Sequence, residues 1–343
     1  MRNQEVKSYS RLLVAACMVL SLSSCNYFNK KPSPAQAPVA DKEFQSSIDA
    51  TFATLLVSDI EMIGSFTGEG IEYPNFYNQS PASYVTSTQG TLTPITDIAS
   101  KYHFTAFNRT LCYDGHMRDG TVNLRYENST QHANYYRDYG FYGEITLSDY
   151  KVDGWLIRTV PNGAPCKVYN QLNGANYDPT QTKLSWSIEG SFEFIHPTDP
   201  SRNMTWSGKL TKTLANSTDR NVFDPSKQKA INWPMGRVEY TGWATGLTSG
   251  NVPYTFSIYN RLPLTRDFNC FPNKIGGVQN PGSVVWNSES HPFIKGMVEF
   301  KTADLYPRQI YYGNEGDPSL PPQCDNSGEV LIKGITYKVD FME

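Results

Sequence analysis

The sequence predicts a mostly β fold, an antiparallel β meander that forms a curved sheet or a sandwich, with one N-terminal amphipathic helix. Two observations support this fold class. Tyrosine (22) and phenylalanine (17) are abundant among the 343 residues, and aromatic residues favour strands. After about residue 84, apolar and polar side chains alternate along much of the chain, which is the pattern of strands with one buried face.

Residues 1–24 are expected to be a lipoprotein signal peptide that the mature protein lacks. A basic start precedes a mostly apolar run from Leu12 to Leu22, which is shorter than the ~20 residues that a membrane-spanning helix needs. The four residues Leu22-Ser23-Ser24-Cys25 resemble the lipobox of bacterial lipoproteins. The resemblance implies cleavage before Cys25 and acylation of that residue. An ordinary secretory signal with an incidental cysteine is the alternative.

Residues 25–40 are then expected to be the lipidated cysteine and a flexible tether, because three prolines stand there among small and polar residues. Removing residues 1–24, which carry a net charge of +2, changes the formal net charge of the chain from −3 to −5. A mildly acidic chain does not favour nucleic acid as a partner. The expected partners are the lipid membrane, through acylated Cys25, and proteins or glycans of the cell envelope.

Residues 41–66 are expected to form the helix and to pack on the β region. Apolar side chains recur there mostly at steps of three and four, namely Phe44, Ile48, Phe52, Leu55, Leu56, Ile60 and Ile63. Asp41 suits the start of this helix and Gly64 its end. A helix on a membrane surface would carry basic residues on its polar face, and Lys42 is nearly alone, so the apolar stripe is expected to face a sheet.

Residues 67–343 are expected to form the all-β region, as one domain or as two β units. Alternating apolar residues mark its strands: Val122-Leu124-Tyr126, Leu184-Trp186-Ile188, Phe192-Phe194, Met204-Trp206, Tyr254-Phe256-Ile258, Val298-Phe300, Val330-Ile332 and Ile335-Tyr337-Val339-Phe341. Turns are expected at Asp114-Gly115, Asp119-Gly120, Asp153-Gly154, Asn162-Gly163, Asn173-Gly174 and Ser249-Gly250. Short connections favour antiparallel pairing, and residues 217–234, which lack periodicity, are expected to be a long loop.

Four cysteines remain in the mature chain besides Cys25, and export to an oxidising compartment predicts that they form two disulfides. Three pairings are open. Pairing of neighbours, Cys112 with Cys166 and Cys270 with Cys324, closes the shortest loops and is mildly favoured by chain entropy.

The sequence predicts no catalytic residue, no cofactor and no metal site. The histidines belong to no HExxH motif, and the chain has no GxSxG elbow. Two carboxylate pairs, Glu144 with Asp149 and Glu189 with Glu193, leave a glycoside hydrolase as the least favoured alternative. A loop with Asn314, Glu315, Asp317, Asp325 and Asn326 carries oxygen ligands that suit Ca²⁺, but these residue types are also what turns need.

Among the six tryptophans, two are candidates for stacking on a ligand. Trp155 follows the turn Asp153-Gly154, and Trp233 precedes a proline in the expected long loop. Trp186 and Trp206 alternate with apolar partners and are expected in the core. An exposed pair of aromatic rings would suit a glycan-binding surface.

The whole chain resembles the uncharacterised lipoproteins that are common in Bacteroidota. Its lipobox, its proline-containing tether, its β region rich in tyrosine and asparagine, and the C-terminal order of Tyr311-Tyr312-Gly313 before Cys324-Asp325-Asn326 carry this resemblance. It implies an outer-membrane lipoprotein. No acidic residue stands in positions 26–31, which favours the periplasmic side over the cell surface. The expected function is non-catalytic, structural or protein-binding, with a glycan-binding surface module as the alternative.

Overall fold

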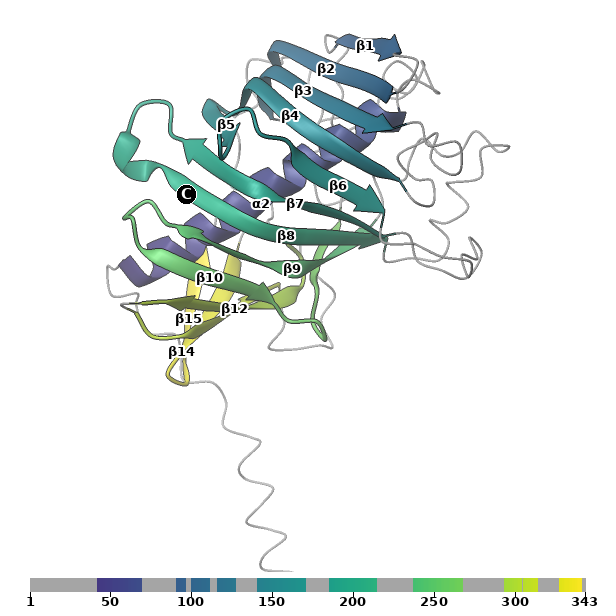
Figure 1. The fold of residues 1–343 in the computed structure, drawn as a ribbon. Coiled ribbons are helices and arrows are strands. Elements are labelled where there is room, and N and C mark those ends of the chain that lie inside the picture. Colours follow the sequence, from purple (N-terminus) through teal and green to yellow (C-terminus); the bar gives the residue numbers. More distant parts are fainter. Residues whose placement is uncertain are drawn as a thin grey trace, which may run out of the picture.

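The computed structural model describes residues 42–69, 91–96, 100–111, 116–127, 141–170, 185–214, 237–267, 293–303, 305–313 and 327–340. In these ranges one long helix, α2 (Lys42–Glu69), lies against the inner face of a 15-stranded antiparallel sheet (Figure 1). The predicted fold class, mostly antiparallel β with one N-terminal helix, is confirmed. No helix within the described ranges is long and apolar enough to cross a membrane.

The strands follow one another in the sheet nearly as they do in the sequence. They are β1 (Thr91–Thr96), β2 (Ser100–Leu111), β3 (Met117–Glu127), β4 (Tyr142–Val152), β5 (Trp155–Thr159), β6 (Cys166–Asn170), β7 (Ser185–Ile195), β8 (Met204–Leu214), β9 (Arg237–Leu247), β10 (Pro253–Ile258), β11 (Leu264–Asp267), β12 (Gly296–Thr302), β13 (Arg308–Tyr312), β14 (Ser327–Ile332) and β15 (Ile335–Asp340). Only β6, which pairs with β4 and β7, and β11, which pairs with β9, lie off the main path. The arrangement is therefore a meander.

The alternating apolar residues point inward, as the sequence predicts. Trp186, Ile188, Phe192 and Phe194 on β7 are all buried, and the other alternating runs within the described residues behave in the same way. Ile335 is the exception, because it follows the β14–β15 turn and is 41% exposed.

The turn predictions are partly right. Asp153-Gly154 joins β4 to β5 with both residues at positive φ (52° and 86°), and Ser249-Gly250 joins β9 to β10. Asp119-Gly120 is not a turn. It lies inside β3, where the register against β4 shifts in a β-bulge, and Gly120 has a φ of 83°. The turn at Asn162-Gly163 lies between β5 and β6, which do not pair with each other.

Helix α2 does not end at Gly64, contrary to the expectation, but continues to Glu69. Gly64 serves packing instead of termination. A Cβ atom on this residue would lie 2.4 Å from Cδ1 of Ile145 on β4, so the glycine allows the helix and the sheet to approach closely.

The polar side of α2 is also buried, which the apolar stripe does not predict. Ten polar residues of the helix are buried, namely Ser46, Ser47, Asp49, Thr51, Thr54, Ser58, Asp59, Glu61, Ser65 and Thr67. The stripe residues Ile48, Phe52 and Leu55 are only partly buried. The sheet curves around the helix, because Thr67 is hydrogen-bonded to β2 and Phe44 packs on β15.

Basic side chains on the inner face of the sheet form ion pairs with acidic side chains of α2. Asp59 forms an ion pair of 2.5 Å with Arg118 of β3 and accepts a hydrogen bond of 2.7 Å from the hydroxyl of Tyr150 on β4. Glu61 forms an ion pair of 2.6 Å with Lys212 of β8. Buried charges are tolerated only where they are paired and hydrogen-bonded, so these pairs fix the position of the helix along the sheet.

Two further cations hold the same helix from the C-terminal half of the sheet. Arg266 of β11 donates a hydrogen bond to the hydroxyl of Ser58, and Arg308 of β13 donates to the hydroxyls of Ser46 and Ser47. Because α2 is bound by both halves, the sheet and the helix form one packed unit.

Cys166 is a free thiol, so the expected Cys112–Cys166 disulfide is wrong. It begins β6, is 1% exposed, and pairs with Ile145 in the middle of β4. Thr110, two residues before Cys112, lies through Arg118 of β3 beside the other end of β4, at Val152. Val152 is seven positions after Ile145 on β4, which corresponds to roughly 23 Å along a strand. The Cα atoms of a disulfide are about 4.4–6.8 Å apart.

We expect the Cys166 thiol to resist alkylation in the folded protein. Burial raises its pKa to about 12, and the thiolate is the nucleophile. Peptide mass spectrometry should find Cys166 unmodified by iodoacetamide under native conditions and fully modified in urea without any reductant. If modification in urea required a reductant, Cys166 would be disulfide-bonded.

Candidate functional site

One row of paired residues crosses the outer face of the sheet, the face turned away from α2. We call it the outer row. Its members, in strand order from β3 to β14, are Arg125, Glu144, Lys167, Glu189, Lys209, Trp243, Ser257, Glu299, Gln309 and Leu331, and each is the register partner of the next. Neighbouring strands lie about 4.8 Å apart, so adjacent side chains of the row are in reach of one another.

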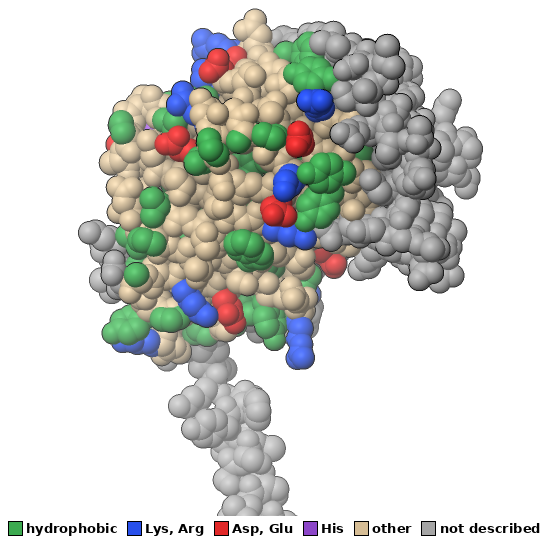
Figure 2. Space-filling view, viewed as in Figure 1, with side chains coloured by type: hydrophobic (Ala, Val, Ile, Leu, Met, Phe, Trp, Pro, Cys, Tyr) green, Lys and Arg blue, Asp and Glu red, His purple; other side chains and the backbone are tan. Residues whose placement is uncertain are grey.

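The first five positions of the outer row alternate in charge. Arg125, Lys167 and Lys209 stand between or beside Glu144 and Glu189. Opposite charges on facing strand positions stabilise a sheet by roughly 0.2–1 kcal/mol per pair. Figure 2 shows the same mixing on the visible face, where acidic and basic side chains lie close to one another. This face is therefore polar without a strong field of either sign.

Trp243 of β9 is the exposed tryptophan of the outer row. Its side chain is 54% exposed. Glycines of β8 and β9 bring the two strands together around it: a Cβ atom on Gly208 would lie 2.1 Å from the carbonyl oxygen of Trp243, and one on Gly242 would lie 2.1 Å from that of Lys209. Gly242 also has a φ of 140°, which favours glycine. The close approach of β8 and β9 leaves the indole standing above a surface of small side chains.

Small hydroxyl residues surround Trp243. Ser257 is its register partner on β10, and Thr241 and Thr245 are its neighbours on the same face of β9. Ser207 faces Thr245 across the β8–β9 pair. The indole is therefore a single large apolar group within a field of hydroxyls.

A second aromatic group lies on the same face, toward β4 and β6. Tyr142 and Tyr169 stack with their centroids 6.5 Å apart and an interplanar angle of 26°. The ammonium of Lys209 lies 5.2 Å from the centroid of the Tyr169 ring, and the Tyr169 hydroxyl donates a hydrogen bond to Glu189. Lys209 thus stands between this pair and Trp243.

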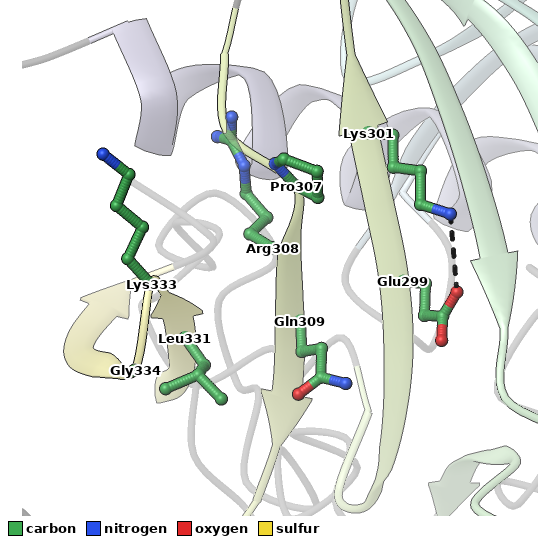
Figure 3. A pocket seen from close by; sticks show the side chains of 8 residues that line it. All are labelled: Glu299, Lys301, Pro307, Arg308, Gln309, Leu331, Lys333 and Gly334. Atoms are coloured by element: carbon green, nitrogen blue, oxygen red, sulfur yellow. Dashed lines mark ion pairs between the residues drawn. The ribbon is translucent and has the colours of Figure 1, made fainter.

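A shallow recess of about 340 Å³ lies over β12, β13 and β14 (Figure 3). Glu299, Lys301, Pro307, Arg308, Gln309, Leu331, Lys333 and Gly334 line it. Lys301 and Lys333 stand on opposite sides of Pro307, and Lys301 lies 3.9 Å from Glu299. The recess is open and holds one carboxylate, which is too few for a pair of catalytic carboxylates.

The carboxylate pairs considered for hydrolysis do not meet in a cleft. Glu144 and Glu189 lie in the outer row on either side of Lys167, and Asp149 is exposed. Glu193 is opposite Thr205 on β8. In the described part of the chain, no group of three or more His, Cys, Asp or Glu side chains is arranged to hold a metal ion.

The prediction that Trp155 is exposed is wrong. The side chain is 9% exposed and packs edge-on against Phe52 of α2, with ring centroids 5.1 Å apart. His196 covers it from the β7–β8 connection, and the guanidinium of Arg202 lies 5.8 Å from its ring. The turn before Trp155 folds β5 back over the helix, which buries the indole.

Several residues singled out from the sequence lie outside the described residues. They are Cys25, Cys112, Cys270, Cys324, Trp233, the loop 217–234 and the Ca²⁺ candidates Asn314, Glu315, Asp317, Asp325 and Asn326. The pairing of Cys270 with Cys324 and the stacking role of Trp233 therefore stay predictions.

Sequence reasoning missed Trp243, although the signal was present. Val238, Tyr240 and Ala244 are buried at alternate positions of β9, so an odd-numbered residue among them must face outward. None of the family models, curated proteins or solved structures with which the chain was compared matches it.

Proposed function

We propose that this chain is a non-catalytic lipoprotein of the outer membrane that binds a protein of the cell envelope through the outer face of its sheet. Acylated Cys25 and the tether 25–40 would hold the β domain at the membrane, on its periplasmic side. The exposed indole of Trp243 on a broad, mixed-charge face carries this proposal.

The chemistry around Trp243 suits a protein interface. Tryptophan, tyrosine and arginine supply most of the binding energy at such interfaces, usually near the centre of a patch with a polar rim. The stacked pair Tyr142 and Tyr169 lies to one side of Trp243, and charged side chains of alternating sign lie between this pair and the indole. Complementary charges on a partner would fix its register without requiring a strongly charged surface.

We expect a photoreactive phenylalanine derivative at position 243 to crosslink one discrete partner in living cells. The same derivative at exposed Arg158 on β5 is the control and should give no such product. Trp243→Ala should abolish co-purification of the crosslinked partner while changing the free energy of unfolding by less than about 0.5 kcal/mol, as for other surface substitutions. Absence of a product at position 243 would contradict the proposal.

Glycan binding is the second candidate, because small hydroxyl side chains surround the exposed indole. An aromatic face with a few polar groups beside it can stack on a sugar ring and orient its hydroxyls. A glycan array with the wild-type protein and Trp243→Ala tests it: signals that vanish in the variant favour glycan binding. Silence of the folded wild-type protein on the array, together with a protein crosslink at position 243, decides for the protein partner.

A further inference from the structure

Four exposed side chains lie at one end of the sheet, on or beside the β12–β13 connection and the β14–β15 turn, and we call them the tip patch: Lys301, Tyr306, Lys333 and Ile335. Lys301 and Lys333 line the recess, whereas Ile335 is the register partner of buried Ile332 and lies toward the inner face. The Lys301 side chain is 60% exposed, Tyr306 is 52% exposed, and Ile335 is 41% exposed. The strand register brings Lys301 and Lys333 to either side of Pro307. The patch combines two cations, one amphipathic ring and one aliphatic side chain.

The β14–β15 turn holds Lys333 in place. Lys333 and Gly334 both have positive φ values, 50° and 80°, as in the tight turns that suit hairpins. The Lys333 ammonium lies 3.3 Å from the centroid of the Tyr306 ring. This contact joins the hairpin to the β12–β13 connection, so the cation and the ring are presented together.

The tip patch lies beside the start of α2, which is where the tether joins the domain. Phe44 packs on Tyr337 of β15 with ring centroids 5.3 Å apart. Arg308, which lines the recess, donates hydrogen bonds to Ser46 and Ser47 of the helix. Sixteen residues lie between Cys25 and Lys42, and the 17 Cα–Cα steps span at most about 60 Å when extended.

We propose that the tip patch rests on the membrane to which Cys25 is anchored, with an anionic lipid headgroup phosphate in the recess between Lys301 and Lys333. This inference rests on the acylation in the proposed function. Headgroup phosphates attract lysines. Tyrosine is enriched at the membrane–water interface, because its ring is apolar and its hydroxyl is polar. Ile335 adds apolar surface. The tether keeps lipid headgroups at a high effective concentration near the patch.

Charge in the recess favours this ligand. Glu299 is the one carboxylate among the residues that line the recess, and its contact with Lys301 of 3.9 Å is at the outer limit of an ion pair. The Lys333 side chain lies on the other side of the recess and points away from Glu299 (Figure 3). Lys301 is free to turn toward a phosphate without breaking a close pair. Binding a headgroup there would direct the tip patch to the bilayer. The headgroup would occupy the β12–β14 end of the outer row, where Glu299, Gln309 and Leu331 line the recess, and would leave Trp243 on β9 uncovered.

Lysine footprinting of the acylated protein tests this orientation. Full-length protein purified from membranes is placed in vesicles with 30% anionic lipid, in vesicles of zwitterionic lipid only, or in detergent, and treated with an acetylating reagent. We expect Lys301 and Lys333 to react at least fivefold more slowly in anionic vesicles than in the other two conditions. Lys167 in the outer row is the internal control and should react equally in all three.

In the wild-type protein, hydrogen exchange of the β14–β15 hairpin should differ between anionic and zwitterionic vesicles. The variant Lys301→Gln/Lys333→Gln should remove this difference, and the charge-matched variant Lys151→Gln/Lys167→Gln should keep it. Equal reaction of Lys301, Lys333 and Lys167 in anionic vesicles would overturn the inference. Protection by inorganic phosphate in detergent without protection in vesicles would also overturn it, because the recess would then bind soluble phosphate. Failure of the protein to float with vesicles would refute the acylation itself.

Discussion

Replacing Arg118 by alanine is expected to lower the free energy of unfolding by about 3–5 kcal/mol. The substitution leaves the carboxylate of Asp59 without its ion-pair partner in a buried site, and loss of one member of a buried pair typically costs this much. Arg118 is fully buried, and Asp59 also accepts a hydrogen bond from Tyr150. Urea unfolding followed by fluorescence at neutral pH measures the effect.

Two control variants separate the loss of the ion pair from the loss of packing. Arg125→Ala removes an exposed arginine of the same strand and should change the free energy of unfolding by less than about 0.5 kcal/mol. The triple variant Asp59→Leu/Arg118→Met/Tyr150→Phe replaces the whole group by apolar side chains and should regain most of the loss, since such replacements are often neutral or stabilising. A triple variant as unstable as Arg118→Ala would show that the charges are not what matters.

The strands of this fold could be predicted because burial on one face leaves a period of two. Met204 and Trp206 on β8 are typical, and both are buried. The same count continued along β8 places Lys212 on the inner face, where it meets Glu61. Alternation therefore predicts that the Lys212 side chain points inward. It does not predict the ion-pair partner Glu61, because that residue lies on a helix about 150 residues earlier in the sequence.

The helix shows a second limit of reading periodicity. Its apolar stripe predicts one buried face, and the structure buries the polar side of α2 at least as deeply. Amphipathic patterns assume that a sheet offers only apolar contacts. Here the inner face of the sheet also offers basic side chains, and the polar side of the helix packs against them. They are Arg118, Lys212, Arg266 and Arg308, from four strands.

The candidate site could be predicted only in part. Trp243 is outward by simple alternation on β9, whereas the burial of Trp155 depends on how the β4–β5 hairpin folds over Phe52. The outer row requires knowledge of the strand pairing, since a shift of one residue would turn each side chain to the other face. The local sequence predicts which face of the sheet a residue lies on, but it does not predict which residues lie beside it on the neighbouring strands.

We expect the protein to lose stability steeply above pH 9, because buried acids must ionise when it unfolds. Burial raises the pKa of the Cys166 thiol to about 12 and that of the Tyr240 hydroxyl to about 12, and it raises the pKa values of Tyr254 and Tyr312 further. Their contributions are complete below the unfolded values of 9.0 for cysteine and 10.0 for tyrosine, and they decline as the pH rises toward the folded values.

Lys212 acts in the opposite direction. Burial lowers its pKa from 10.5, so the unfolded chain binds more protons than the folded one below that pH, and this group alone would make stability rise with pH. One lysine offsets only part of the effect of one thiol and three phenols. Each group contributes at most about 1.4 kcal/mol per pH unit, so the free energy of unfolding should show a net fall between pH 9 and pH 11.

Urea titrations at half-unit steps of pH, with and without Tyr312→Phe, identify the groups responsible. Tyr312 lies in the core and is hydrogen-bonded to Thr51 at 2.6 Å, so the variant should be less stable by about 1 kcal/mol at neutral pH. Above pH 10 its stability should fall less steeply than that of the wild type, by about one proton per molecule, or about 1.4 kcal/mol per pH unit. Tyr142→Phe removes an exposed phenol and should keep the wild-type slope. Equal slopes for Tyr312→Phe and the wild type would mean that Tyr312 ionises without unfolding, and the buried face of the sheet would then be open to water.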